Sequence, residues 1–204
     1  LNLKPGNSMG LMKKDMGGAA HVLALAQLIM GAGLKLRLRV LVPAVENAVS
    51  GNAFRPGDVL QSRKGLSVEI GNTDAEGRLI LADGAALVAL GPDLPPFYTD
   101  KDAFADALKA EAEATADPLW RMPLWPPYDE WLRSKIADVN HISDGGHAGS
   151  ITAAFFLKRF VEKAGTYVHF DIFAWNDRSK PGRPVGGEAQ ALRALFSLLR
   201  KKYS

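Results

Sequence analysis

The chain has no cysteine among its 204 residues, and this absence limits the kinds of site that it can form. Disulfides and thiolate metal sites are excluded, so any metal ion must be held by carboxylates, histidines or carbonyl oxygens. Only four histidines are present, and they are spread along the chain. A metal site in this protein would therefore be rich in oxygen ligands.

Long hydrophobic runs and a strong excess of one charge are also absent. No apolar stretch approaches the length of a membrane span, and no secretory signal opens the chain. The formal net charge is only +3, with lysines and arginines scattered apart from a short basic run at 200–202. We therefore expect a cytoplasmic protein with neither a membrane nor a nucleic acid as its partner.

The hydrophobic patterns alternate between helix and strand periods, which predicts the α/β fold class, with a twisted mixed β-sheet sandwiched between helices. The expected helices cover residues 17–30 (buried), 101–116, 128–138, 150–164 (capped by Ser150) and 188–202. The expected strands cover residues 34–43, 66–72 and 166–175. The length suits one large domain with a hydrophobic core of its own.

The stretch GNTDAEGRL at residues 71–79 places Asp74, Glu76 and Arg78 on alternate positions. In an extended or turn conformation these side chains project to the same side. Two neighbouring carboxylates repel each other unless they share a proton or a cation lies between them. The residues alone leave two interpretations open: a divalent metal site, or a salt-bridged turn in which Arg78 neutralises one acid.

A second charged segment precedes the apolar run at 17–30 and includes Lys4 and Asp15. Taken alone, Asp15 is equally consistent with the N-cap of that helix, and Lys4 with a solvated lysine. Among the histidines, His21 and His169 lie on apolar segments and are expected to be structural, whereas His147 lies in a glycine-rich loop that could touch a ligand.

Together these stretches resemble the catalytic domain of the leucyl aminopeptidase family, the cytosol aminopeptidase-type two-metal metallopeptidases. The hallmark octapeptide NTDAEGRL stands intact at residues 72–79. Further matching stretches lie at 1–20, 46–60, 88–99, 145–160, 169–176 and 182–196. The resemblance covers nearly the whole chain, so residues 1–204 are expected to be part of a C-terminal catalytic domain.

The resemblance implies a metal centre that hydrolyses the N-terminal residue from peptides. Two divalent cations (zinc, manganese or magnesium) would be bound, with Asp15 on one ion, Asp74 on the other and Glu76 bridging both. The partners implied are peptides with a free N-terminus, and further copies of the chain in a homo-hexamer.

Three further residues match functional positions of the family. Lys4 would be the catalytic lysine that polarises the scissile carbonyl. Arg78 would hold a bicarbonate that acts as general base, a role suited to the planar guanidinium fork. Met12 would line the pocket for the first side chain of the substrate.

The chain departs from the family pattern in two places. It begins after the segment that supplies a lysine ligand and a bridging aspartate, so three of the five expected ligands remain. Asp83 also runs directly into Gly84, where the family has roughly twenty more residues, including a crossover that needs a dozen or more. Omitted segments, a deliberately shortened protein and a degenerate relative are the possible explanations. The first is favoured because the retained parts keep regular patterns.

The main alternative function is a catalytically inactive relative or fragment that serves as an oligomer scaffold. Glycoside hydrolysis by Asp74 and Glu76 fails on geometry, because carboxylates two residues apart would lie side by side rather than flank a sugar.

Overall fold

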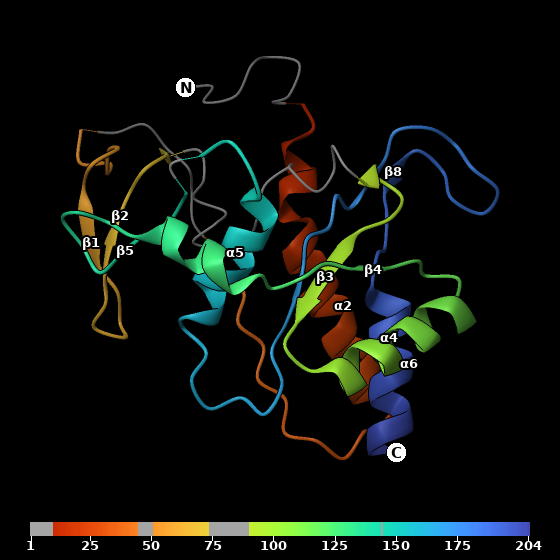
Figure 1. The fold of residues 1–204 in the computed structure, drawn as a ribbon. Helices are drawn as coiled ribbons and strands as arrows, with labels where there is room; N and C mark the ends of the chain where they lie inside the picture. The colour runs from red at the N-terminus through yellow and green to blue at the C-terminus, as the bar shows by residue number, and fades with distance from the viewer. Residues whose placement is uncertain (1–9, 45–50, 74–89, 144) are drawn as a thin grey trace.

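The computed structural model describes residues 10–44, 51–73, 90–143 and 145–204, and these form a mixed α/β fold (Figure 1). The helices in chain order are the 3-10 helix η1 (Met12–Met16), α2 (Gly17–Gly31), α4 (Asp102–Ala114), the 3-10 helix η3 (Pro126–Leu132), α5 (Gly149–Lys158) and α6 (Leu192–Tyr203). The strands are β1 (Val59–Gln61), β2 (Ser67–Glu69), β3 (Pro96–Thr99), β4 (Trp120–Arg121), β5 (Val139–Asn140), β6 (Val168–Phe170), β7 (Trp175–Asn176) and β8 (Gly186–Gly187).

In the part of the chain that the structure describes, the strands group into three small sheets. The first has the order β1-β2-β5, with β1 antiparallel and β5 parallel to β2. The second has the order β4-β3-β6, with β4 parallel and β6 antiparallel to β3. Strands β7 and β8 form an antiparallel pair. The two three-stranded sheets are therefore mixed, in agreement with the predicted fold class.

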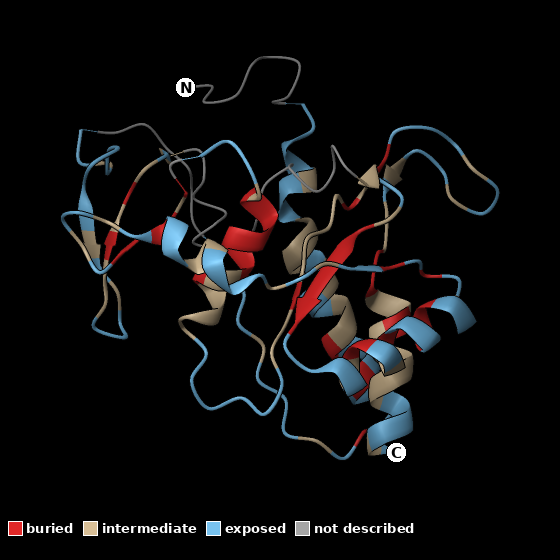
Figure 2. Ribbon diagram, viewed as in Figure 1, coloured by how far each residue is buried: buried red, intermediate tan, exposed pale blue. Residues whose placement is uncertain are grey.

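Strand β3 lies at the centre of the core, and all four of its residues are buried (Figure 2). Successive side chains of a strand point to opposite faces. Phe97 accordingly joins a cluster with α4 and α6, whereas Tyr98 joins a cluster with Ile151 and Ala154 of α5. Helices thus cover β3 on both faces.

Helix α4 packs through a narrow apolar stripe. Ala105, Leu108 and Ala112 recur at helical spacing and are buried against Phe97 and Ala194 of α6. The remainder of α4 is divided between charged residues and apolar ones, mostly alanine, and α4 and α6 lie together at one edge of the molecule (Figure 1).

The N-terminus of α6 is capped from a distance by Asp117. The N-cap position, Ala191, offers no side-chain acceptor. The buried Asp117 carboxylate instead accepts hydrogen bonds from the backbone N–H groups of Ala191, Arg193 and Ala194 at 3.0, 2.9 and 3.1 Å. Because helix N-termini leave amide donors without intrahelical partners, this carboxylate fixes where α6 begins.

Two predictions about the N-terminal third are wrong in part. Residues 34–43 form no strand and are mostly exposed, because no neighbouring strand pairs with them within the described residues. Helix α2 forms as predicted but is not buried: only Ala26 and Ile29 lie inside, while Leu23 and Met30 are 57% and 68% exposed. A helix that is apolar on all sides needs cover on all sides, whereas among the described elements α2 makes its main contacts with η1 and α6.

Two further local predictions need correction. Of the helix predicted at 128–138, only residues 128–132 are helical, as part of the 3-10 helix Pro126–Leu132, which has prolines at its start. Ser150 lies inside α5 rather than capping it, and the N-cap is Ala148 in a left-handed conformation. The Ser150 Oγ accepts a hydrogen bond of 2.6 Å from the Tyr98 hydroxyl, and burial raises the pKa of Tyr98 well above its usual range.

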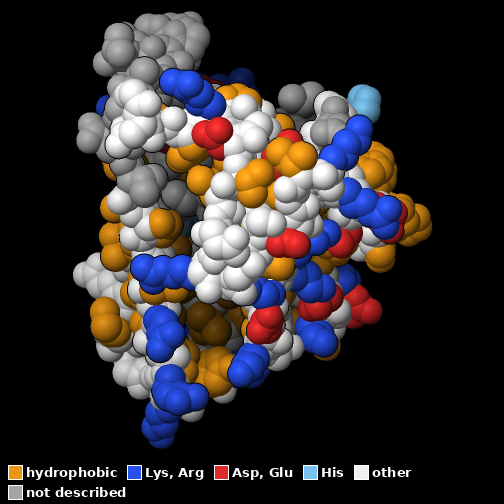
Figure 3. Space-filling view, turned by 90° about the vertical axis from the view of Figure 1, so that its left-hand side faces the viewer, with side chains coloured by type: hydrophobic (Ala, Val, Ile, Leu, Met, Phe, Trp, Pro, Cys, Tyr) orange, Lys and Arg blue, Asp and Glu red, His pale blue; other side chains and the backbone are white. Residues whose placement is uncertain are grey.

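The surface carries its charges in mixed fashion. On the face shown in Figure 3, lysine and arginine side chains are interspersed with acidic and hydrophobic ones. None of the helices in the described ranges is both long and apolar enough to cross a membrane.

Candidate active site

The structure describes two of the six predicted site residues, Met12 and Asp15. Lys4, Asp74, Glu76 and Arg78 lie outside the described residues, so the distances between the predicted metal ligands are not given by the structure. Among the residues that are described, no three histidine, aspartate or glutamate side chains come together to hold a metal ion. The described segments that lead into the site set its surroundings.

Met12 and Asp15 both lie on η1. Residues three apart on a 3-10 helix are eclipsed, so these two side chains project from the same face. Both are partly exposed, and the Asp15 carboxylate lies 3.5 Å from the Lys14 ammonium. The N-cap of α2 is Met16, and α2 has no side-chain cap, so Asp15 is not the helix cap that was the alternative explanation.

The segment that follows β6 packs against η1. The Lys14 ammonium lies 4.8 Å from the centre of the Phe173 ring, and the Lys13 ammonium lies 5.7 Å from that of Trp175. A Cβ at Gly17 would lie 2.4 Å from the Cβ of Ala174, so only glycine fits at this approach. These contacts place η1 beside residues 173–175.

His21 links α2 to the segment before α6. Its Nδ1 hydrogen bonds to the Gly17 carbonyl at 2.6 Å, and its Nε2 accepts a bond of 2.9 Å from the Gln190 backbone N–H. The Gln190 side chain in turn accepts from the Ala174 N–H at 2.8 Å. Because Nε2 accepts, the ring donates through Nδ1 as a neutral imidazole. The prediction that His21 is a structural histidine is confirmed.

His141 holds the backbone at the point where the octapeptide begins. Its Nδ1 accepts a hydrogen bond of 3.1 Å from the Gly71 N–H, and its Nε2 donates to the Asn72 carbonyl at 3.0 Å. The side chain is 1% exposed. A Cβ at Gly71 would lie 2.5 Å from the Ile142 side chain, which explains the glycine. This positioning role was not predicted, because some seventy residues separate His141 from Gly71.

The remaining two histidines differ in burial. His169 lies in β6 and is 6% exposed, and burial lowers its pKa to about 4. The structural role predicted for it is confirmed. His147 is exposed on the loop before α5, and its contact with a ligand stays a prediction.

The profile of the cytosol aminopeptidase family, catalytic domain, matches residues 1–88 and 84–196. The chain belongs to the cytosol aminopeptidase family. The predicted resemblance is thereby confirmed, and the two matched segments meet at residues 84–88.

Individual relatives show the same assignment. The probable cytosol aminopeptidase of Chlorobium phaeobacteroides is 41% identical over 223 residues, covering 98% of this chain and 44% of the relative. That of Geobacter sulfurreducens is 38% identical, with the same coverage. The chain thus spans less than half the length of the curated relatives that it matches.

Solved structures confirm the α/β fold of this domain. The cytosol aminopeptidase from Coxiella burnetii superimposes with a TM-score of 0.92 at 48% identity, covering 98% of this chain and 48% of that one. The bottromycin maturation enzyme BotP in complex with Mn gives a TM-score of 0.89 at 34% identity, covering 98% and 50%.

Proposed function

We propose that this chain is the larger part of the catalytic domain of a metal-dependent aminopeptidase, which removes the N-terminal residue from peptides. The observation that carries the proposal is the family match over residues 1–88 and 84–196, which includes the intact octapeptide at 72–79. The TM-score of 0.92 to a cytosol aminopeptidase adds that the chain adopts the matching fold. A catalytic rather than a purely structural role is favoured.

The metal ligands proposed are Asp15, Asp74 and Glu76. Their carboxylates are the donors that manganese, magnesium and zinc ions accept, and one similar enzyme is described as a complex with Mn. The position of Asp15 fits this role, because it is partly exposed and does not cap α2. Asp15, Asp74 and Glu76 would hold these ions, and the ions would supply Lewis acidity that lowers the pKa of a water molecule and binds the substrate's free amine.

The other side chains of the site orient and polarise the substrate. We assign Lys4 to the scissile carbonyl, where its ammonium stabilises the developing negative charge. Arg78 would hold a bicarbonate in its planar fork, and the bicarbonate would accept the proton of the attacking water. Met12 is assigned to the substrate's first side chain, and its position on the same face of η1 as Asp15 supports this assignment.

The chain as given is proposed to be incomplete around Asp83 and Gly84. The two matched segments meet there, and the alignment to a relative spans 223 residues although this chain has 204. We also propose a homo-hexamer in the cytoplasm, on the strength of the family resemblance. Sedimentation velocity of the chain tests the hexamer. An intact mass of 22.0 kDa would show that Asp83 is bonded directly to Gly84 and would contradict a missing segment.

The deciding experiment compares two proteins. The first is the 204-residue chain. The second, which we call the completed protein, also carries the segments that the Coxiella burnetii relative has before the position of residue 1 and between those of residues 83 and 84. With added manganese, the completed protein should hydrolyse a chromogenic leucine substrate, and Glu76→Gln should abolish turnover. The 204-residue chain should show negligible turnover, because only three of the five expected ligands are present.

Metal content separates the enzyme from a scaffold. After chelation and reconstitution, the completed protein should hold a stoichiometric divalent ion, and Asp74→Asn should lower that content. Asp106→Asn, a change of the same chemistry at an exposed position of α4, serves as the control. A folded, completed protein without bound ion and without turnover would overturn the proposed function and support the scaffold.

A further inference from the structure

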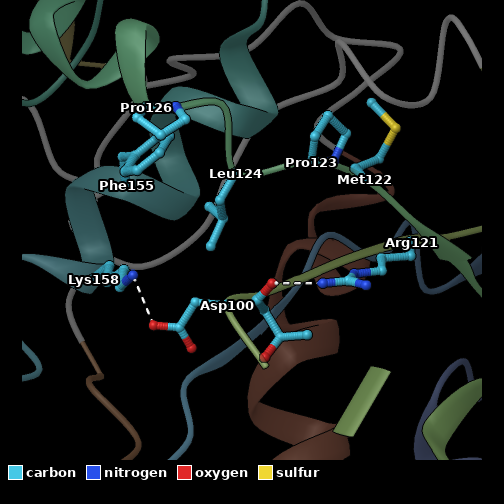
Figure 4. A pocket seen from close by; sticks show the side chains of 9 residues that line it. Asp100, Arg121, Met122, Pro123, Leu124, Pro126, Phe155 and Lys158 are labelled. Atoms are coloured by element: carbon cyan, nitrogen blue, oxygen red, sulfur yellow. Dashed lines mark hydrogen bonds and ion pairs between the residues drawn. The ribbon is translucent and has the colours of Figure 1, made fainter. Parts of the chain in front are cut away.

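A hollow of about 580 Å³ lies between β3, the segment after β4, and α5 (Figure 4). Its polar part is formed by Asp100, Arg121 and Lys158, and its apolar part includes Met122, Leu124 and Phe155. We call it the distal pocket. Neither Met12 nor Asp15, the two proposed site residues that the structure describes, lines it.

The topology places the distal pocket at the end of the sheet away from η1. Strand β6 runs antiparallel to β3, with Phe170 opposite Phe97 and Val168 opposite Thr99. The chain leaves β6 at its Phe170 end and reaches η1 at Phe173. The distal pocket begins at Thr99, the other end of β3, so the length of the strand, roughly 10 Å, separates the two regions.

The charged groups of the distal pocket have hydrogen-bonding capacity left over. The Lys158 ammonium pairs with Asp100 at 2.9 Å, which uses one of its three donors. Among the described residues, Arg121 bonds through one nitrogen only, Nη2, to Asp102 at 2.6 Å and to the Thr99 carbonyl at 3.5 Å. Asp102 is 85% exposed, so this ion pair is weak. Two cations against one lining carboxylate favour an anionic group.

The apolar part of the pocket lies directly beside these charges. Figure 4 shows the Leu124 side chain descending between Lys158 and Arg121, with Phe155 and Pro126 on the Lys158 side. A ligand that contacts both the charged and the apolar part of the pocket would carry a carboxylate and an apolar side chain on the same residue.

We propose that the distal pocket binds an α-carboxylate attached to an apolar side chain. Arg121 holds the carboxylate in its planar fork, and the apolar side chain packs on Leu124 and Phe155. Two sources share this chemistry: a free amino acid, whose ammonium would reach Asp100, and the C-terminal residue of a short peptide. A free amino acid is also a product of the proposed reaction. Only this link makes the inference rest on the proposed function.

Binding can be measured on the full chain without metal. Trp120 and Trp125 adjoin the pocket residues in sequence and are 53% and 54% exposed, so their fluorescence reports on the site. In buffer with a chelator, leucine should give a saturable change, and N-acetyl-leucine, whose amine is blocked, should give one as well if the pocket takes the terminal residue of a peptide. Leucinamide, which lacks the carboxylate, should bind at least about tenfold more weakly.

Matched variants test whether the fluorescence change comes from binding in the distal pocket. Arg121→Gln should weaken leucine binding about tenfold, and so should Leu124→Asn, which places an amide in the apolar part. Arg133→Gln is the control, because Arg133 lies nearby in sequence, pairs with Glu130 and does not line the pocket. Circular dichroism checks that each variant is folded.

The ligands separate the two sources. Leucine binding without N-acetyl-leucine binding identifies the free amino acid, and binding of both identifies the terminal residue of a peptide as well. The proposal for the distal pocket is overturned by any of three results: leucinamide binds as tightly as leucine, both folded variants bind leucine as the parent does, or no ligand gives a saturable change. Because no metal is present, none of these results bears on whether the completed protein is an aminopeptidase.

Discussion

The Nδ1 atom of His141 accepts a hydrogen bond of 3.1 Å from the backbone N–H of Gly71, immediately before the octapeptide. The other ring nitrogen donates to the Asn72 carbonyl at 3.0 Å, so one imidazole holds backbone groups of two consecutive residues. The chain therefore enters its proposed metal-binding segment from a fixed direction, set by a side chain that follows β5.

Replacing His141 by alanine should destabilise the chain and weaken manganese binding by the completed protein. The change removes the partner of the Gly71 N–H and of the Asn72 carbonyl, two hydrogen bonds that are only partly buried, and the loss of each costs about 0.5–1.5 kcal/mol. Urea unfolding measures the stability, and a manganese titration measures the affinity. His147→Ala, at an exposed position, is the control and should change the stability by less than about 0.5 kcal/mol. Equal stability of the two variants would show that His141 does not hold the segment.

Replacing Gly17 by alanine should separate η1 from the segment after β6. The new methyl group would lie 2.4 Å from the Ala174 Cβ, although the backbone conformation at Gly17 suits alanine. The expected loss of stability is about 1–3 kcal/mol. Gly31→Ala is the matched control, because a Cβ there meets nothing within 4 Å. At Gly31 the helix-favouring alanine should stabilise α2, if anything. Thermal unfolding of both variants tests the difference, and a Gly17→Ala protein as stable as the parent would contradict the contact.

Replacing Asp117 by alanine should unfold the start of α6. Three backbone donors lose their acceptor, and the expected cost is about 2–3 kcal/mol, the upper range for a charged cap. Hydrogen exchange of the α6 amides should accelerate first. Asp106→Ala, an exposed aspartate on α4, should leave the exchange rates of α6 as they are. Unchanged α6 exchange in Asp117→Ala would mean that another group caps the helix.

The stability should fall as the pH is lowered from 6.5 towards 4, in part because of His169. Burial lowers its pKa to about 4 in the folded chain, whereas an unfolded histidine titrates near 6.5. The unfolded state therefore binds more protons in this window, so this contribution is complete above pH 6.5 and is lost as the pH falls. The full effect is at most about 3 kcal/mol.

His169→Gln provides the test of this pH dependence. Glutamine does not titrate, so the difference between urea stabilities at pH 7 and pH 5 should be smaller in the variant than in the parent. His147→Gln is again the exposed control and should keep the parental difference. If both variants keep it, other groups cause the pH dependence.

The sequence allowed good prediction where the signal is local. Helix α4 was predicted within two residues at each end, because its apolar spacing is a property of the helix itself. The octapeptide at 72–79 identified the family because eight consecutive residues match, and the family profile confirms this. The positions of its side chains remain a prediction from resemblance.

Prediction failed where the outcome depends on distant partners. Alternation in residues 34–43 indicated a strand, yet a strand needs a neighbour to accept its hydrogen bonds, and none of the described strands pairs with it. Ser150 precedes an apolar run like an N-cap, but the Tyr98 hydroxyl engages it from β3. His141 carries no local motif at all. The outcomes at Ser150 and His141 are set by contacts with residues 52 and 70 positions away.

The exposed apolar side chains of α2 form a surface to which another polypeptide could bind. Covering a side chain such as Leu23 or Met30 completely would release about 1.5–3 kcal/mol. Any polypeptide that binds this helix in the folded state but not in the unfolded one would raise the melting temperature in proportion to the logarithm of its concentration. The thermal stability of this chain is thus expected to depend on what surrounds α2 as well as on its own core.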